Sequence, residues 1–132
     1  MKYQDALLKT RALGLQFLPA HYNRVVPHNK TETRMHFLIK STLVYFFIQA
    51  GETTFTDFPI GVGVFAVFNL DRMICYEIET RPSSTIQTEK RTLLQGYTNR
   101  IEILILYAQK FATDIPTLFT QIGSLLGLKL KG

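Results

Sequence analysis

The sequence predicts an α/β fold in which a central mixed β-sheet is flanked by helices. A long apolar segment at 30–50 has the character of a buried helix, and β-rich segments follow it from residue 53. Two apolar strands, 73–80 and 101–107, are then separated by a polar helical segment. Strands joined through a helix are usually parallel and connected by a right-handed crossover. With 132 residues, the chain has the length of one domain with its own core.

The first 29 residues predict a basic helix and a linker. Residues 2–18 have the spacing of a weakly amphipathic helix that Gly14 interrupts. Pro19 and Pro27 predict a loop or an extended linker after it. The remainder, 30–132, is predicted to be a single α/β domain.

The segment 30–50 predicts the strongest helix of the chain. Asn29 and Glu32 have the spacing of a capping box at its start, and Gly51 is placed to end it. Past its first turns the helix is apolar nearly all round, which is typical of a buried helix. The uncharged stretch 41–51 has 11 residues, which is too short to span a bilayer.

From residue 53 the pattern predicts three short strands at 53–58, 62–68 and 73–80. The tetrapeptide NLDR at 69–72 has the composition of a turn, so the third strand is expected to pair back on the second as a hairpin.

Three elements complete the expected order. A polar helix at 84–97 is capped by Ser84, and the nearly continuous apolar strand 101–107 is typical of a covered strand. Asp114 then caps a last helix with Pro116 in its first turn.

The positive charge is concentrated near the N-terminus. The net charge is +5, and residues 1–40 hold seven Lys and Arg against two acids, whereas residues 41–132 are balanced. A concentrated positive patch suits a polyanion such as nucleic acid, which we expect to be DNA. The alternative is a basic surface that has no partner.

The cysteine content and the hydropathy of the sequence indicate its cellular environment. Cys75 is the single cysteine, so an internal disulfide or a cysteine-based zinc site is impossible. The sequence shows no signal peptide, and we expect a cytoplasmic protein that has no membrane partner and can form a homodimer.

The stretch MICYEIET at 73–80 places Glu77 and Glu79 two positions apart in an apolar run. In a strand, both carboxylates point to one side and Ile78 points to the other. A cation held between the two acids would relieve their repulsion. The alternative is an edge strand with a solvated acidic face.

The order of these elements, together with YEIET, resembles the restriction-endonuclease-like superfamily over residues 30–110. Its metal-dependent nucleases carry a Pro-Asp … (Asp/Glu)-x-Lys motif. In that family, strand acids hold Mg²⁺ beside the scissile phosphate, and the metal activates water. The resemblance therefore implies a restriction-endonuclease-like order of elements (α-β-β-β-α-β-α), Mg²⁺ as cofactor and nucleic acid as partner.

Carried over to this sequence, the resemblance makes Glu77 the motif acid. Glu79 stands where the family has its lysine, and Lys90 or Arg91 on the next helix would supply the basic group instead. The catalytic candidates are thus Glu77, Glu79 and Lys90, at the rim of a groove.

The aspartate of the motif is missing. The resemblance places it near Gly63 or Val64, where no acid is found. Asp57 on the preceding strand or Asp71 in the turn would need a rearranged site, and Glu32 matches an acid on the first helix of the family. The candidate metal ligands are Glu77, Glu79, Glu32 and Asp57.

Three functions are compatible with these features. The first is a nucleic-acid-binding protein with an incomplete nuclease site of weak or absent activity, and the missing aspartate favours it. The second is an active, resolvase-like Mg²⁺-dependent endonuclease, and the third is a protein-interaction module without enzymatic activity. The candidate nucleic-acid contacts are Arg24, Lys30, Arg34 and Arg91.

Overall fold

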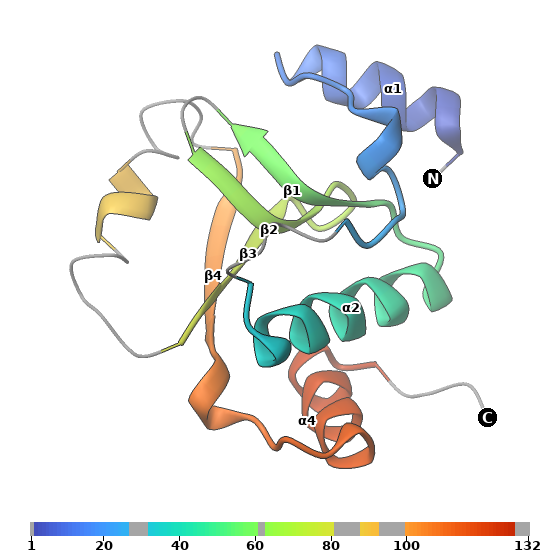
Figure 1. The fold of residues 1–132 in the computed structure, drawn as a ribbon. Coiled ribbons are helices and arrows are strands. Elements are labelled where there is room, and N and C mark those ends of the chain that lie inside the picture. Colours follow the sequence, from blue (N-terminus) through green and yellow to red (C-terminus); the bar gives the residue numbers. More distant parts are fainter. Residues whose placement is uncertain (1, 27–31, 61–62, 81–87, 93–99, 129–132) are drawn as a thin grey trace.

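Four strands form one mixed sheet in the order β1-β2-β3-β4 (Figure 1). This computed structural model describes residues 2–26, 32–60, 63–80, 88–92 and 100–128. The strands are β1 (Thr54–Ile60), β2 (Gly63–Asn69), β3 (Ile74–Glu79) and β4 (Glu102–Tyr107). The first three form an antiparallel meander, and β3 and β4 are parallel. The predicted α/β class, hairpin and parallel pair are thus confirmed.

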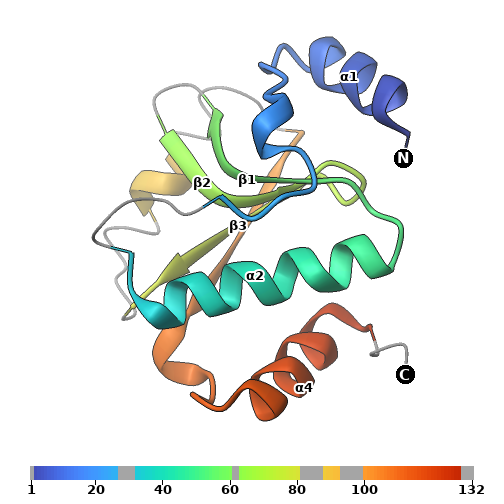
Figure 2. The same ribbon diagram turned by 45° about the vertical axis from the view of Figure 1, so that its right-hand side comes forward.

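Two helices cover one face of the sheet. Figure 2 shows α2 (Arg34–Gln49) lying along the sheet and α4 (Ile115–Leu126) packed beneath it. Phe47 of α2 and Leu118 of α4 join one apolar cluster with Tyr76 and Ile78, which alternate with the acids of β3. This burial holds the predicted helix against the sheet through the apolar area that it removes from water.

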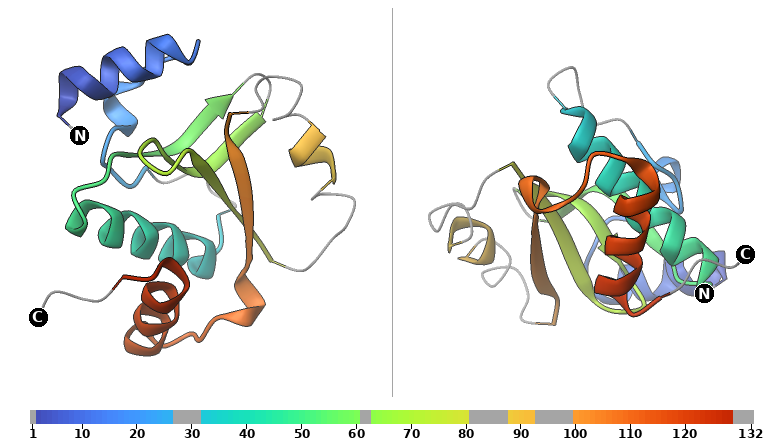
Figure 3. Two further views of the ribbon diagram at one scale, coloured as in Figure 1. Left: turned by 180° about the vertical axis from the view of Figure 1, so that it is seen from behind. Right: turned by 90° about the horizontal axis from the view of Figure 1, so that it is seen from below.

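A second apolar cluster lies on the other face. It joins α1 (Tyr3–Ala12) and Leu15 to side chains of three strands, among them Phe55, Phe68 and the fully buried Cys75. Residues 88–92 are helical and lie across the sheet from α2 and α4 (Figure 3). The other residues of the predicted helix 84–97 lie outside the described ranges.

The segment after α1 covers the outer edge of β1. It passes through a 3-10 turn, η1 (Pro19–His21), and then runs antiparallel to the strand. The N–H of Asn23 donates to the carbonyl of Thr54 at 2.7 Å, and the N–H of Val26 donates to Thr56 Oγ1 at 3.0 Å. The predicted linker is therefore an ordered border of the sheet up to residue 26.

The helix boundaries differ from the expected ones in two places. Thr33, rather than Asn29, is the N-cap of α2, and its Oγ1 accepts a hydrogen bond from the N–H of His36; Asn29 itself lies outside the described residues. The first helix ends at Ala12 instead of residue 18, because Gly14 adopts a φ of 75°. The predicted cap of α4 is confirmed, since the Asp114 carboxylate accepts from the N–H of Thr117.

No helix within the described part of the chain has the length and apolarity that crossing a bilayer requires. Residues 41–51 belong to α2 and to the turn that follows it.

Replacing Thr56 by Val should loosen the covering segment. The fully buried Thr56 hydroxyl accepts from Val26 N–H and donates to the carbonyl of Arg24 at 2.6 Å, and Val has the same shape without these bonds. We expect a loss of roughly 1–3 kcal/mol in the free energy of unfolding by urea titration, because two backbone groups lose their partner. Trypsin should also cleave after Arg24 faster.

The exposed Thr120 supplies the control for this prediction, since Thr120→Val makes the same chemical change on α4. Its free energy of unfolding should stay within about 0.5 kcal/mol of the wild type. Equal losses in the two variants would show that the hydrogen bonds of Thr56 with Arg24 and Val26 contribute no more to stability than an exposed hydroxyl does.

Candidate functional site

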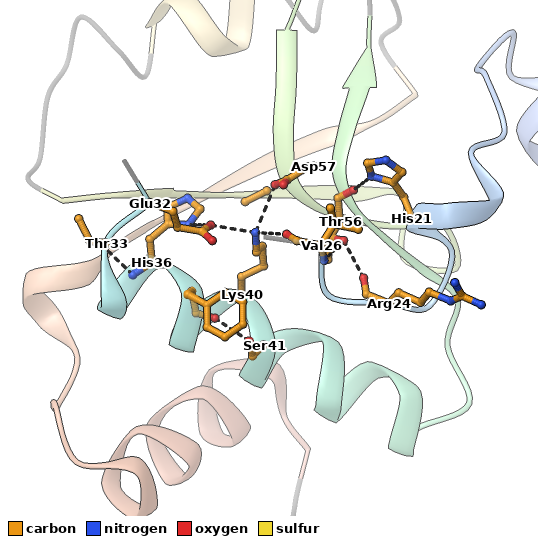
Figure 4. Close-up of polar contacts among 12 residues, drawn as sticks. His21, Arg24, Val26, Glu32, Thr33, His36, Lys40, Ser41, Thr56 and Asp57 are labelled. Atoms are coloured by element: carbon orange, nitrogen blue, oxygen red, sulfur yellow. Dashed lines mark hydrogen bonds and ion pairs between the residues drawn. The ribbon is translucent and has the colours of Figure 1, made fainter. Parts of the chain in front are cut away.

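Asp57 interrupts the regular pairing of β1 and β2. Its φ is 45°, in the left-handed region that Asp adopts more readily than most residues. The pairs on either side of it, Thr56–Val67 and Phe58–Phe65, keep one register, and the ladder passes over the position of Asp57. The irregular backbone turns the Asp57 carboxylate toward α2 (Figure 4).

The pairing of β2 with β3 ends at the same level of the sheet. Its last pair is Val67–Tyr76, and the next step of the register would place Ala66 opposite Glu77. There the N–H of Ala66 donates instead to Glu77 Oε1, at 3.1 Å. Asp57 on β1, Ala66 on β2 and Glu77 on β3 therefore lie at the same level of the sheet.

A hollow of about 210 Å³ opens at this point. Its polar lining consists of His36, Asp57, Glu77, Glu79 and Lys90. A second hollow, of about 220 Å³, adjoins it and shares His36 and Glu79; its further polar lining consists of Glu32, Thr33 and Thr80. We call the two together the acidic hollow. The structure therefore brings all four predicted metal ligands and Lys90 to one place.

Lys40 is the buried cation that contacts two acids of the acidic hollow, Glu32 and Asp57. Its side chain is 0% exposed, and its ammonium lies 2.8 Å from Glu32 Oε2 and 3.4 Å from Asp57 Oδ1. It also donates to the carbonyl of Val26 at 2.5 Å (Figure 4). A buried charge without partners costs several kcal/mol, so the ammonium requires these oxygens. Glu32 and Asp57 thus serve as its counter-charges.

His36 completes this network one turn after Glu32. Its Nδ1 lies 2.6 Å from Glu32 Oε2, the same oxygen that Lys40 contacts. An ionised carboxylate can only accept hydrogen bonds, so Nδ1 of His36 carries the proton. His36 lines both parts of the acidic hollow.

Lys90 is the second cation of the hollow. Its ammonium lies 2.5 Å from Glu77 Oε2 and 5.5 Å from the centre of the Phe65 ring. It also donates to the carbonyl of Val64 at 3.4 Å. The Glu77 side chain is 8% exposed, whereas that of Lys90 is 25% exposed, so this pair lies nearer to solvent than Lys40 does.

The proximity of the two acids of β3 affects the pKa of Glu79. Partial burial raises the pKa of its carboxyl, and the neighbouring charge of Glu77 raises it further. Lys90 and His36 act in the opposite direction and lower that pKa. The two carboxylates of β3 therefore repel each other, as their spacing predicted, and Ile78 between them faces the α2 cluster.

The contacts do not fit the Mg²⁺ site that the resemblance implies. Glu32 and Asp57 are held by Lys40, and the two oxygens of Glu77 are held by Lys90 and the N–H of Ala66. In the ranges described above, no group of three His, Cys, Asp or Glu side chains is arranged to hold a metal ion. Lysine ammonium groups are the cations that these acids contact.

The candidate nucleic-acid contacts do not all lie at the hollow. Arg24 lies on the opposite side of Lys40 from His36 (Figure 4), and its guanidinium is exposed. Arg34 is exposed in the first turn of α2, and Arg91 is exposed beside Lys90. Lys30 lies outside the described residues.

Sequence reasoning missed Lys40 and His36. A single lysine within the apolar stretch of a buried helix is the signal that could have identified Lys40, because a buried cation needs an acid. The spacing of four between Glu32 and His36, at the start of the predicted helix, could have indicated a contact between them. The contact of Ala66 has no signal in the sequence, since it is made by the backbone.

Removing the ammonium of Lys40 should destabilise the protein in a pH-dependent way. In Lys40→Met the buried carboxylates of Glu32 and Asp57 lose their counter-charge, and we expect a loss of about 3–5 kcal/mol at pH 8. The deficit should shrink at pH 5, because protonation neutralises acids whose pKa the substitution raises. Urea unfolding at the two pH values measures this.

The double variant Lys40→Met/Glu32→Gln is the control for this charge argument. It should recover part of the stability at pH 8, since one of the two uncompensated carboxylates is gone. A deficit that is equal at pH 5 and pH 8 would show that packing, rather than charge, explains the loss.

Replacing Glu79 by Gln should have the opposite effect. The pKa of the Glu79 carboxyl is raised in the folded protein. Such a carboxyl lowers the free energy of unfolding at every pH above its pKa in the unfolded chain. Glu79→Gln should therefore raise the free energy of unfolding at pH 7.5, by about 0.5 kcal/mol, the scale of partly exposed charges. The gain should vanish near pH 3, where both states are protonated. Glu102→Gln, at an exposed acid of β4, should give no such gain.

Comparisons with known proteins assign no family to this geometry. The chain matches no protein-family model, no curated protein and no solved structure. The function of the acidic hollow therefore has to follow from its own contacts.

Proposed function

We propose that this protein binds nucleic acid, with DNA as the first candidate, through a restriction-endonuclease-like domain whose nuclease site is incomplete. The observation that carries the proposal is the placement of Glu32, Asp57, Glu77 and Glu79 around one hollow, with Lys90 beside them. These are the residues that the resemblance selects. Because lysines hold three of the four acids, we expect weak cleavage or none.

The distribution of charge supports a polyanionic partner. The ion pairs within the fold contain the acids Glu32, Glu52, Asp57 and Glu77 and the bases Lys40, Arg72 and Lys90. Among the described residues, these pairs hold four acids and three bases, and the whole chain has a net charge of +5. The positive net charge favours binding to phosphates.

A second candidate is the active Mg²⁺-dependent endonuclease. Partial burial raises the pKa of Glu79, and the charge of Glu77 raises it further; a shared cation would relieve the repulsion between the two carboxylates. The same residues would then be catalytic, with Lys90 beside the metal. A cleavage assay separates this candidate from the first one.

Binding to DNA should depend steeply on salt and should not require a metal. In EDTA, we expect the slope of log K against log salt to flatten by about one for each phosphate contact that Arg24→Ala, Lys30→Ala and Arg34→Ala remove. Fluorescence anisotropy with duplex and branched DNA measures the slope, and plasmid nicking with Mg²⁺ or Mn²⁺ measures cleavage.

Lys110→Ala is the matched control, because it removes an exposed positive charge outside the first 40 residues. An unchanged slope in the triple variant would exclude the N-terminal footprint, and absent binding of wild type would exclude the proposed function. Robust cleavage that Glu77→Gln abolishes would instead establish the second candidate.

A further inference from the structure

The chain covers the two outer edges of the sheet differently. Residues 22–26 lie along β1 and form hydrogen bonds with Thr54 and Thr56. β4 is the other end strand, and in the described ranges no strand or bridge pairs with its outer side. In the left-hand view of Figure 3, β4 is the strand nearest to the viewer. Among the described elements, β4 therefore offers the edge to which a further strand can be added.

The β4 edge lacks the residues that usually protect a sheet edge. Such edges commonly carry charges, proline or a bulge, which keep other strands from pairing. Residues 103–109 are uncharged and contain no proline or glycine, and the ladder with β3 runs without a break from Glu102 to Tyr107. Leu104, in the middle of the strand, is 39% exposed. This composition is typical of a strand that is covered and paired on both sides.

The backbone of β4 determines which residues can bind a further strand. The N–H of Glu102 donates to the carbonyl of Met73 at 3.0 Å, so the backbone groups of Glu102 face β3. Successive residues of a strand direct these groups to alternate sides. The N–H and carbonyl groups of Ile103 and Ile105, and the N–H of Tyr107, therefore point away from β3.

We propose that two copies of this chain pair through β4, in antiparallel orientation, about a two-fold axis at Ile105. In this register Ile105 lies opposite itself and Ile103 lies opposite Tyr107, so the outward backbone groups of the two copies meet. Leu104 lies opposite Leu106 of the second copy, which covers its exposed side chain. Because this axis is perpendicular to the sheet, the two sheets join into one, with α2 and α4 of both copies on the same face.

A second copy of the chain suits this edge because the edge is complementary to itself. The cross-strand pairs of the register are Ile with Tyr, Ile with Ile and Leu with Leu, and apolar pairs of this kind stabilise adjacent strands. The charges nearest to the uncharged run are Glu102 on one side and Lys110 on the other. Antiparallel pairing brings these opposite charges toward each other, whereas parallel pairing would bring each beside its own copy.

Cysteine cross-linking tests the register. Residues that exchange hydrogen bonds across antiparallel strands have Cα atoms about 5.5 Å apart, which a disulfide can bridge. We expect Ile105→Cys to form a disulfide-linked dimer when oxidised with diamide. Ile103→Cys is the matched control on the same strand and should form none, because its two copies would lie about 14 Å apart. The native Cys75 is buried, so it does not compete.

Sedimentation equilibrium without nucleic acid tests the association itself. We expect a dimer for the wild type and at least about tenfold weaker association for Ile105→Pro, since proline removes an outward N–H at the axis. Leu104→Lys should weaken association as well, because it places a charge against an apolar side chain. Leu8→Lys, the same change at an exposed leucine of α1, should not. Thermal unfolding checks that the variants fold, and Leu104→Lys decides if Ile105→Pro does not.

Three results would overturn the proposal. The first is a wild type that stays monomeric at about 100 μM, and the second is a dimer that neither Ile105→Pro nor Leu104→Lys weakens. The third is equal cross-linking of Ile105→Cys and Ile103→Cys, which would exclude the register. Nucleic acid is absent from both experiments, so these results leave the proposed function untouched.

Discussion

The charge of Lys40 is the constraint on which the arrangement of the site depends. Its ammonium is wholly enclosed, so the fold must bring oxygens to it from the covering segment, from the residue before α2 and from β1. The contact with β1 goes together with the left-handed backbone of Asp57, which interrupts the β1–β2 ladder next to Ala66. The N–H of Ala66 in turn donates to Glu77. A single buried cation therefore links the sheet irregularity to the acid that faces the hollow.

The charges are compensated differently at the inner and the outer end of the acidic hollow. At its inner end, acids and lysine compensate one another within the core, whereas at its outer end Glu77 and Glu79 keep an unfavourable proximity that shows in the pKa of Glu79. Under the proposed function, the occupied inner acids would account for little metal-dependent chemistry at the hollow. The net charge of +5 is compatible with the proposed binding role.

The fold could be predicted further than the site. Apolar alternation and turn residues located β2 and β3 within two residues of their bounds, and the helical connection predicted the parallel partner of β3. The predictions of the α2 cap and of the end of α1 were wrong. Several polar residues near a helix start compete for the cap, and only tertiary contacts decide between them. The first helix ends early because of the backbone conformation of Gly14. The spacing of Glu77 and Glu79 predicted a shared face, but no periodic pattern reports that Asp57 would leave the ladder or that Lys40 would face inward.

The covering segment along β1 has a consequence for the behaviour of shortened forms of the chain. The outer edge of an end strand exposes a row of unpaired backbone donors and acceptors, which other chains can pair with. Residues 22–26 occupy that row through the Asn23 and Val26 contacts. A fragment starting at α2 would uncover a strand with Phe55 and Phe58 among its side chains. It would also leave Lys40 without two of its acceptors, the carbonyl of Val26 and the carboxylate of Glu32. The segment before residue 27 therefore covers a strand edge that a shortened chain would leave open to pairing with another chain.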